Sequence, residues 1–457
     1  MHIQLPPAVA AFSLLALAIA TPAHAATVAV TNCNDHGAGS LRAAVAVAAN
    51  GDVVDLRGLS CNRIGLTSGA IIVQQADLTV RGPGWAKFTV SGNARSQVFR
   101  QSPIPPPADP GNPRVDGTLR LQGFTVSWGR DEESNPLGGC IFANSRVVLD
   151  HMQVCHCVAR GTDPVYPGGV GGGVFAWNDV TLIHSHVHSN EAPGGTGGGV
   201  ETFGELFADH SRISHNSADV NGGGASAIRG LTLSYSTVDH NTSASGNAGG
   251  VATAGATLIS KSTIAYNHAD FRGAGEFESI RPTRIVESTI SHNTANRGEA
   301  GIQLDGRFAL TEVLNSTIVF NVAANASDGS CSEGAGIALA GPVKIVSSIV
   351  SGNTCAGQPS NVGQEAGNPP PQVIEVVGSD NLIGASTVPL PPDTLALDDP
   401  RLAPLANNGG PTWTHALLSV SPAIDRGSNL SKFHYDQRGP CFLRVKGVRA
   451  DIGAFER

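Results

Sequence analysis

The chain has 457 residues, and its composition argues against several classes of protein. Only 14% of its residues are charged and the net charge is −8, whereas a nucleic-acid-binding surface needs a basic patch. The low content of aromatic residues also leaves few side chains on which bases could stack. After residue 25 no run of about eighteen apolar residues occurs, so we expect no transmembrane helix there.

Residues 1–25 have the pattern of a secretory signal peptide. An apolar stretch from Ala10 to Ala20 precedes Thr21-Pro22-Ala23-His24-Ala25, whose small residues are typical of a cleavage site after Ala25. The segment lacks Lys and Arg, which departs from the usual pattern. The stretch is too short to span a bilayer comfortably, which disfavours an uncleaved anchor. We therefore expect a protein that is secreted, on the cell surface or in the periplasm.

Residues 26–69 are predicted to form an N-terminal cap. The segment from Ser40 to Ala49 is rich in Ala and predicts a short helix, with Ser40 as its N-cap. A helix placed before stacked strands covers an edge that would otherwise pair with other chains. We interpret Asp35, His36 and Arg42 as structural rather than catalytic residues.

Two kinds of residue repeat with a common period between residues 171 and 353. A glycine closes a cluster of small residues every 25 or 26 residues. Asparagines recur at the same interval as far as Asn293 and then at longer intervals up to Asn353. A shared period of this length predicts a solenoid. The glycines are Gly173, Gly199, Gly224, Gly250, Gly275 and Gly301, and the asparagines are Asn190, Asn216, Asn241, Asn267, Asn293, Asn321 and Asn353.

The residues between these markers predict β-strands. Short β-branched runs such as Thr257-Leu258-Ile259 and Ser262-Thr263-Ile264 alternate apolar and polar side chains, and no repeat holds a helical pattern. Three strands in about 26 residues make one coil of a parallel β-helix, with the asparagines stacked in a hydrogen-bonded ladder. We assign residues 70–385, about ten to twelve coils, to this all-β domain. The Pro-rich segments 102–113, 160–167 and 356–372 should loop out of it.

The eight cysteines all follow the signal segment, in a compartment that permits disulfides. Cys331 and Cys355 fall in corresponding loops of adjacent coils, close to the separation that a disulfide needs. Cys33 and Cys61 would staple the N-terminal end. The partners of the remaining four stay open, and the motif Cys155-His156-Cys157 is too tightly spaced for the usual zinc pattern. These four are Cys140, Cys155, Cys157 and Cys441.

The candidate catalytic residues lie on one predicted outward face. In the coil that begins at Gly301, Gln303 and Asp305 point outward, with Arg307 just beyond. In the preceding coil, Glu276 and Glu278 would point inward, where unpaired carboxylates are costly. However, Gly275 precedes its ladder asparagine by 18 residues instead of the 17 found in earlier coils. One extra residue, read as a bulge, would turn both glutamates outward.

This acidic face allows three interpretations. Paired carboxylates could act as acid and base on a glycosidic bond. They could instead hold Ca²⁺ while an arginine acts as the base of a uronate β-elimination. The third interpretation is a solvated surface without chemistry. A separate feature is that His215, His240 and His292 each precede a ladder asparagine, so they should stack outside one turn, where they could bind metal or respond to pH.

The pattern from Gly173 to Asn353 resembles the bacterial right-handed parallel β-helix proteins of the pectate-lyase-like superfamily. This resemblance and the general handedness of parallel crossovers imply a right-handed coil. Residues 386–457 resemble a second family, the C-terminal module called choice-of-anchor Q of exported β-helix proteins. The motifs that carry this resemblance are Asn407-Asn408-Gly409-Gly410-Pro411-Thr412-Trp413, Ser421-Pro422-Ala423-Ile424-Asp425 and Asp451-Ile452-Gly453-Ala454-Phe455-Glu456.

The C-terminal module is predicted to cap the last coil. Trp413, Ile452 and Phe455 would be buried against that coil, and Asp436, Arg438 and Asp451 could pair across the cap. Family members are surface or secreted proteins of mostly unknown activity. The resemblance therefore implies a location more than a reaction.

Two functions follow from these expectations. The first is a secreted or cell-surface scaffold, adhesin-like and monomeric, that binds glycans or other surfaces along one long face. The alternative is an enzyme, a polysaccharide lyase or glycoside hydrolase, that uses Glu276, Glu278, Asp305 and Arg307. The fold alone does not choose between them.

Overall fold

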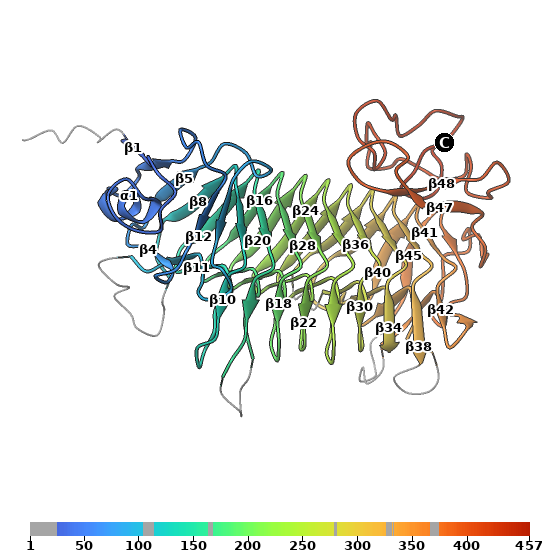
Figure 1. Cartoon of the computed structure of the whole chain (residues 1–457). Coiled ribbons are helices and arrows are strands. Elements are labelled where there is room, and N and C mark those ends of the chain that lie inside the picture. Colours follow the sequence, from blue (N-terminus) through green and yellow to red (C-terminus); the bar gives the residue numbers. More distant parts are fainter. Residues whose placement is uncertain are drawn as a thin grey trace, which may run out of the picture.

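The computed structural model describes residues 25–103, 114–162, 168–277, 281–325, 331, 333–365 and 374–457. These residues wind into a right-handed parallel β-helix, as the repeat predicts (Figure 1). Most of the Pro-rich segments 102–113 and 160–167 lies outside the described residues. Segment 356–372, predicted to loop out, is described up to residue 365 and contains two strands, β43 (Gln358–Pro359) and β44 (Val362–Gln364), and β44 pairs with β39 (Ile337–Leu339) in sheet C. Each regular coil has four strands rather than the predicted three, because a strand of two to four residues follows each ladder asparagine. The chain passes through sheets C, A, B and D in that order.

Sheets A and B lie on consecutive sides of the coil. Sheet A consists of β1 (Thr27–Ala29), β2 (Val53–Asp55), β5 (Leu78–Arg81), β8 (Thr118–Gln122), β12 (Arg146–Asp150), β16 (Val180–Ile183), β20 (Glu205–Asp209), β24 (Gly230–Ser234), β28 (Ala256–Ser260), β32 (Thr283–Val286), β36 (Thr311–Leu314), β40 (Val343–Val346) and β45 (Val376–Ser379). Sheet B consists of β3 (Arg63–Gly65), β6 (Thr89–Ser91), β9 (Thr125–Ser127), β13 (Gln153–Cys155), β17 (His186–His188), β21 (Arg212–Ser214), β25 (Thr237–Asp239), β29 (Thr263–Ala265), β33 (Thr289–Ser291), β37 (Thr317–Val319), β41 (Ile349–Ser351) and β46 (Leu382–Ile383).

Sheets D and C complete the coil. Sheet D consists of β10 (Arg130–Asp131), β14 (Val158–Ala159), β18 (Glu191–Ala192), β22 (Ser217–Ala218), β26 (Thr242–Ser243), β30 (His268–Ala269), β34 (Thr294–Arg297), β38 (Val322–Asn325), β42 (Thr354–Cys355) and β43 (Gln358–Pro359). Sheet C consists of β4 (Ile71–Val73), β7 (Phe99–Gln101), β11 (Ile141–Ala143), β15 (Val174–Ala176), β19 (Val200–Thr202), β23 (Ala225–Ala227), β27 (Val251–Thr253), β31 (Gly275–Phe277), β35 (Ile302–Leu304), β39 (Ile337–Leu339) and β44 (Val362–Gln364).

The predicted helix is present as α1 (Leu41–Val47), and the Ser40 hydroxyl accepts a hydrogen bond from the Ala43 amide at 3.2 Å. Leu41 and Val45 pack into the main apolar core, so the helix covers the start of the stack. Strand pairing nevertheless begins before the helix, because β1 already pairs in parallel with β2.

The asparagine ladder runs inside the coil at the turn between sheets B and D. From Asn190 to Asn353 the side-chain amide of each asparagine donates to the side-chain carbonyl of the next at 2.8–3.0 Å. These side chains are almost completely buried, so the hydrogen bonds remove the desolvation cost of their amides. The ladder continues through Asn361 to Asp398 at its C-terminal end.

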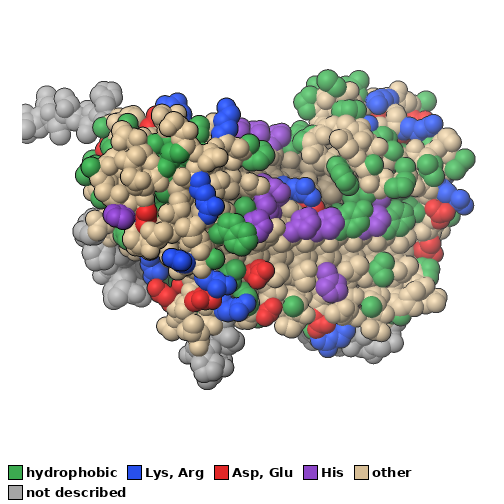
Figure 2. Space-filling view, viewed as in Figure 1, with side chains coloured by type: hydrophobic (Ala, Val, Ile, Leu, Met, Phe, Trp, Pro, Cys, Tyr) green, Lys and Arg blue, Asp and Glu red, His purple; other side chains and the backbone are tan. Residues whose placement is uncertain are grey.

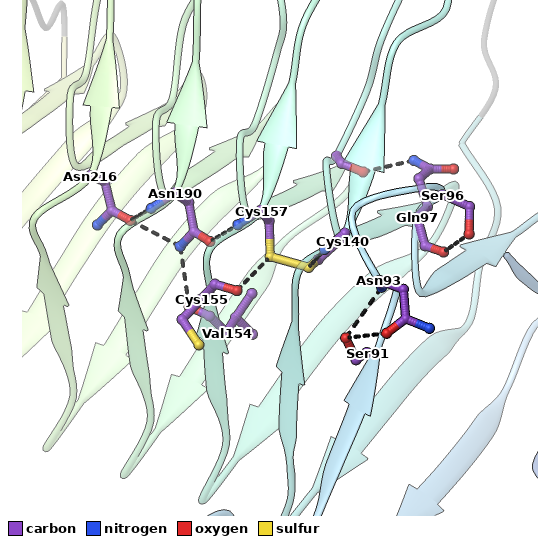
Figure 3. The surroundings of a disulfide bond; sticks show 12 residues. Ser91, Asn93, Ser96, Gln97, Cys140, Val154, Cys155, Cys157, Asn190 and Asn216 are labelled. Carbon is purple, nitrogen blue, oxygen red and sulfur yellow. Dashed lines mark hydrogen bonds between the residues drawn. A yellow bond between two sulfur atoms is a disulfide. The ribbon is translucent and has the colours of Figure 1, made fainter. Parts of the chain in front are cut away.

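The predicted disulfides Cys33–Cys61 and Cys331–Cys355 are present, and a third bond joins Cys140 to Cys157. Cys157 lies at the N-terminal end of the ladder, where its backbone N–H donates to the side-chain oxygen Oδ1 of Asn190 at 3.0 Å (Figure 3). Cys140 precedes β11 and Cys157 precedes β14, so the disulfide joins two corners of the same coil. Cys155 and Cys441 are free thiols.

Residues 402–457, called the C-terminal module from here on, do not cap the last coil. They include the antiparallel pair β47 (Leu402–Ala406) and β48 (Thr414–Leu417) and lie along the outer face of sheet B (Figure 1). Ile452 and Phe455 are buried as predicted, but against the outward side chains Val319 and Ile349. Trp413, predicted to be buried, is 51% exposed. The module lies over sheet B because the outward side chains of its later coils include apolar ones, whose burial is favourable.

The end of the stack is closed by other residues. Ile374, just before β45, and Val388, after β46, belong to the main apolar core. Within the C-terminal module, Arg438 pairs with Asp436 at 2.6 Å, as expected. Asp451 instead accepts hydrogen bonds from the backbone amides of Asp425 and Arg457 at 2.7 and 2.8 Å.

Candidate functional site

Sheet B presents two different outer faces along its length. The middle residue of each strand points into the core, so the first and third residues point outward. From β29 onward the outward residues are small or apolar and are buried, for example Ala265 and Val319. In β17, β21 and β25 they are polar or charged and lie outside the C-terminal module. These open-face residues are His186, His188, Arg212, Ser214, Thr237 and Asp239.

A column of stacked rings borders this open face at the turn between sheets A and B. The column, called the A–B column, contains His151, His184, His210 and Tyr235, one residue from each coil. Their ring centroids are separated by 4.8, 5.1 and 4.9 Å, close to the spacing of paired strands. All four residues have positive φ, between 46° and 52°, a conformation in which the turn repeats from coil to coil. Because the rings cover one another's faces, their polar edges are what remains at the surface.

A second column, the B–D column, borders the other side. It contains the predicted stack of His215 and His240, with centroids 4.9 Å apart, and continues through Tyr266 to His292. Toward the N-terminus Trp128 stacks on His156 at 4.7 Å. The column is therefore aromatic over most of its length, which extends the prediction made from three histidines. Figure 2 shows the histidine side chains gathered on the face between the N-terminal coils and the C-terminal module.

Two further histidines lie on the sheet between the columns. His186 and His188 both point outward from β17, and their ring centroids are 4.3 Å apart. Nε2 of His186 lies 2.8 Å from the Ser214 hydroxyl, and Nε2 of His188 lies 2.6 Å from the Gln153 amide. Burial lowers the pKa of His186 to about 3 and that of His188 to about 4. Both rings are therefore neutral at neutral pH.

The charged centre of the open face is a group of three residues. Arg212 donates from Nε and from its second terminal nitrogen to the two oxygens of Asp239, at 2.7 and 2.5 Å. Asp239 also lies 2.7 Å from Nδ1 of His240. Burial alone would raise the pKa of Asp239, but the hydrogen bonds from Arg212 and His240 outweigh it and lower this pKa. Asp239 therefore fixes the positions of a guanidinium and an imidazole at the surface.

Two adjoining cavities follow the open face. One of about 410 Å³ lies over His184, His186 and Tyr235, and one of about 200 Å³ lies over Asp239 and Tyr266. Arg212, Thr237 and Pro411 line both cavities. We call this combined space the cleft. Trp85 borders it toward the N-terminus and Trp413 of the C-terminal module borders it at the other end, both about half exposed.

The acidic face predicted from sequence is arranged differently. Gly275 pairs with Val251 and Ile302, so Ala274, not Gly275, takes the corner position of Gly250. The change of phase therefore comes from altered lengths of the connecting segments and not from a bulge within the strand. Glu276 does lie beside Gln303 in register, on the outer side of sheet C, but it is only 6% exposed.

The predicted catalytic residues are held in separate ion pairs. Asp305 is 5% exposed and accepts hydrogen bonds from Nε and a terminal nitrogen of Arg307, at 2.9 and 2.7 Å, and from its backbone N–H at 2.9 Å. Burial raises the pKa of Asp305, but these bonds lower it more, so the carboxylate is ionised. Glu276 pairs with Arg272. Glu278 lies outside the described residues. A catalytic role of these residues stays a prediction, although an exposed acidic face is not what the structure shows.

Arg272 is the centre of a buried acidic cluster. Its guanidinium also contacts Glu299 at 3.6 Å and Glu365 at 3.0 Å. Burial raises the pKa of Glu299 to about 7, against the effect of Arg272. On the same sheet, burial raises the pKa of Glu201 to about 8. An ion such as Ca²⁺ needs several free carboxylate oxygens, and this donor set, already committed to arginine, does not fit it.

Within the described ranges, no group of three or more His, Cys, Asp or Glu side chains is arranged to hold a metal ion. In the same part of the chain, no helix is long and apolar enough to cross a membrane. Of the histidines on this face, the sequence pattern predicted only those that directly precede a ladder asparagine. The alternation His184-Ser185-His186-Val187-His188 is the signal that would have located the open face, because alternate residues of a strand share one side.

Comparison with known proteins gives little beyond the fold. No protein-family model matches the chain, so its resemblance to the choice-of-anchor Q module stays a prediction. No curated protein sequence matches it either. Among solved structures, the crystal structure of pectate lyase Pel9A aligns with 94% of this chain and 96% of its own, at 14% sequence identity and a TM-score of 0.44. The assignment of a parallel β-helix rests on the strand pairing itself.

Proposed function

We propose that the protein binds a polysaccharide chain in the cleft over the open face of sheet B. The observation that carries this proposal is the change of outward residues along one continuous sheet. Serine and threonine occur on both parts of the sheet, but where the C-terminal module covers it the other outward residues are alanine, valine, isoleucine and leucine, and where the sheet is open they are histidine, arginine and aspartate. A surface kept polar beside two ring columns fits a hydrated ligand better than a protein core.

The chemistry of the cleft suits a chain of sugar units. The edges of the stacked imidazoles offer hydrogen-bond donors and acceptors at intervals of about 5 Å, and Arg212 and Thr237 add further polar groups. Trp85 and Trp413 are half exposed at the two ends of the cleft, where an indole can pack against the apolar face of a sugar. The stack direction and the cleft run together, so an extended ligand would lie along several coils.

We further propose that the protein acts outside the cytoplasm, as a secreted or cell-surface scaffold. The three disulfides support this location, because such bonds persist in oxidising compartments. The proposed signal peptide, residues 1–25, lies almost entirely outside the described residues. Detection of a mature N-terminus at Ala26 in exported protein would test the location.

A pair of matched variants tests the binding site. Thr237→Trp would fill the cleft where its two cavities meet. Thr232→Trp would place the same side chain on the outward side of sheet A in the same coil. In affinity electrophoresis against acidic and neutral polysaccharides, we expect a retarded wild-type band, an unretarded Thr237→Trp band and a wild-type pattern for Thr232→Trp. Equal retardation of both variants would place binding elsewhere, and no retardation of the wild type by any polysaccharide would reject the function.

A second candidate function is a polysaccharide lyase in the same cleft. It is favoured by one arrangement: Asp239 holds Nδ1 of His240, which leaves Nε2 to accept a proton, beside the guanidinium of Arg212. Turnover would appear as ultraviolet absorbance of unsaturated products from a uronate polymer, with and without Ca²⁺. His240→Gln should abolish it while Asp305→Asn leaves it unchanged. The reverse result would move the reaction to the residues predicted from sequence.

A further inference from the structure

The cleft is lined mostly by side chains that are uncharged. Leaving histidine aside, Arg212 and Asp239 are the charged residues among those that the structure describes along its two cavities. Gln153, Ser211 and Thr237 contribute an amide and two hydroxyl groups to the same lining. The charge of a ligand would therefore be balanced mainly by what this one ion pair leaves free.

The ion pair leaves little charge free. Arg212 donates to both carboxylate oxygens of Asp239, at 2.7 and 2.5 Å, and Asp239 is 4% exposed. The positive and the negative charge thus lie side by side in the wall of the cleft. An anionic ligand that reached Arg212 would also meet the carboxylate that already binds this guanidinium, and like charges at an interface oppose binding.

The histidines of the lining add little positive charge. Burial lowers the pKa of His186 to about 3, so this ring is neutral at neutral pH. The rings of His210 and His240 each have a carboxylate at Nδ1, that of Asp209 at 3.0 Å and that of Asp239 at 2.7 Å. A proton gained by either ring would therefore be offset by its neighbouring carboxylate.

These groups match the hydroxyls of neutral sugars. A sugar hydroxyl both donates and accepts hydrogen bonds, and so do a neutral imidazole, a serine or threonine hydroxyl and a glutamine amide. A carboxylate or sulfate only accepts, and its transfer from water to a wall without a free cation is costly. Trp85 and Trp413, both about half exposed, add apolar ring faces at the two ends of the cleft.

We propose that the ligand of the cleft is an uncharged polysaccharide. This inference rests on the proposed function, because it names the chemical class of the chain that the cleft binds. A polyuronate or a sulfated glycan would bring several negative charges along the cleft, and Arg212 is already paired. An uncharged ligand would leave the lyase reaction without its uronate substrate, so that second candidate function and this inference exclude each other.

Affinity electrophoresis with matched polymers tests the inference at about pH 8, where an ordinary histidine is mostly unprotonated. The pairs share a backbone and differ in charge: hydroxyethyl and carboxymethyl cellulose, dextran and dextran sulfate, and methyl-esterified and de-esterified polygalacturonan. Retardation counts as cleft binding only if Thr237→Trp abolishes it. In at least one pair we expect the uncharged member to bind the wild type about 10-fold or more tightly than the charged member.

The possible outcomes separate the inference from the proposed function. Stronger cleft binding of the charged members would overturn the inference and leave polysaccharide binding in place. No retardation that depends on Thr237, by any of the polymers, would overturn both.

A change of charge within the wall gives a second test. Asp239→Asn keeps a side chain of the same shape but leaves the charge of Arg212 unbalanced, so it should strengthen binding of the charged member by about 5-fold or more. The control is Asp270→Asn, which removes the same charge from a pair with Arg297 on the sheet D side of the coil. This control should bind both members as the wild type does. Equal binding of the charged member by the two variants would show that charge does not decide the choice of ligand, and the inference would fall.

Discussion

The open and the covered halves of sheet B share a backbone but differ in what their outer side chains do. In the open half the A–B column is a stack of three histidines and a tyrosine. In the covered half the same turn carries Lys261, Glu287 and Asn315, and these bind the C-terminal module. Lys261 donates to the carbonyl oxygens of Tyr435 and Asp436 at 2.7 and 2.6 Å, and Asn315 donates to that of Ser428 at 2.9 Å.

The comparison shows that the repeat specifies the coil and not its surface. Inward positions are apolar in both halves, because every coil must fill the same core. The type of outward side chain depends on what it contacts, which is the C-terminal module in one half and solvent or a ligand in the other. The boundary falls between β25 and β29, where the charged Asp239 is followed in register by Ala265.

We expect the largest effect on stability when a charged side chain of the open half is placed in the covered half. Val319 occupies the same column as Asp239, and it packs in the apolar interface with the C-terminal module. Val319→Asp would bury an unpaired carboxylate, which we expect to lower the free energy of unfolding by more than about 3 kcal/mol or to detach the module. Denaturant unfolding and limited proteolysis of residues 402–457 would measure this. Val319→Ala, the control, should cost only about 2 kcal/mol and keep the module protected.

A change of pH should weaken the interface of the covered half. Burial lowers the pKa of His415 from 6.5 to about 4. Nδ1 of its ring lies 2.7 Å from the Ala403 carbonyl oxygen and Nε2 lies 2.8 Å from the Ser291 hydroxyl. Between these pKa values the unfolded chain binds a proton that the folded chain does not. Stability is therefore complete above pH 6.5 and falls as the pH falls toward about 4, by up to about 3 kcal/mol from this group.

Denaturant unfolding at pH 7 and at about pH 4.5 would measure that loss. His186 and His188 in the open half contribute with the same sign, since burial also lowers their pKa values. The contribution of the interface is therefore the part that His415→Gln removes. A variant with the full pH dependence of the wild type would show that His415 does not titrate with folding.

The ladder should respond equally in both halves, because it lies inside the coil. Asn241 and Asn321 each donate a side-chain hydrogen bond to the next asparagine and accept from the previous one. Replacing either by alanine leaves buried partners unsatisfied, at a cost of about 1–3 kcal/mol per variant. Thermal or denaturant unfolding of both variants should give similar losses. A much larger loss for one would mean that the outer surface influences the ladder.

The smallest effect is expected in the open ring column. The ring of His210 stacks between His184 and Tyr235, and its side chain is 38% exposed. His210→Ala should therefore change the free energy of unfolding by less than about 1 kcal/mol. If the cleft binds a glycan, the same variant should weaken that binding, because His210 lines the larger cavity. A large loss of stability would instead give the column a structural role.

The fold could be predicted because its causes are local and repeated. Each ladder asparagine and each apolar strand residue meets the same neighbour one coil later, so a period in the sequence becomes a contact in space. The disulfide Cys331–Cys355 followed from the same logic. Cys140–Cys157 did not, because Cys157 takes a ladder position that in later coils belongs to asparagine.

The functional face was harder to predict because it depends on contacts without a period. Nothing in the repeat says where the C-terminal module lies, and that placement decides which outward residues are buried. The glutamates were predicted to be exposed from strand phase alone, but Arg272 and segments from neighbouring coils cover Glu276. The phase of a strand determines on which side of the sheet a side chain lies. Whether that side chain is buried there depends on residues far away in sequence.

The parallel register has one consequence for how such a cleft could change in length. Every coil adds one strand to sheet B and one residue to each ring column, while the C-terminal module holds on to fixed partners from Lys261 to Asp380. Duplication or deletion of a whole coil upstream of Lys261 would lengthen or shorten the cleft by one strand spacing and leave the anchored end intact. The length of ligand that the cleft can hold would then increase with the number of coils between its two ends.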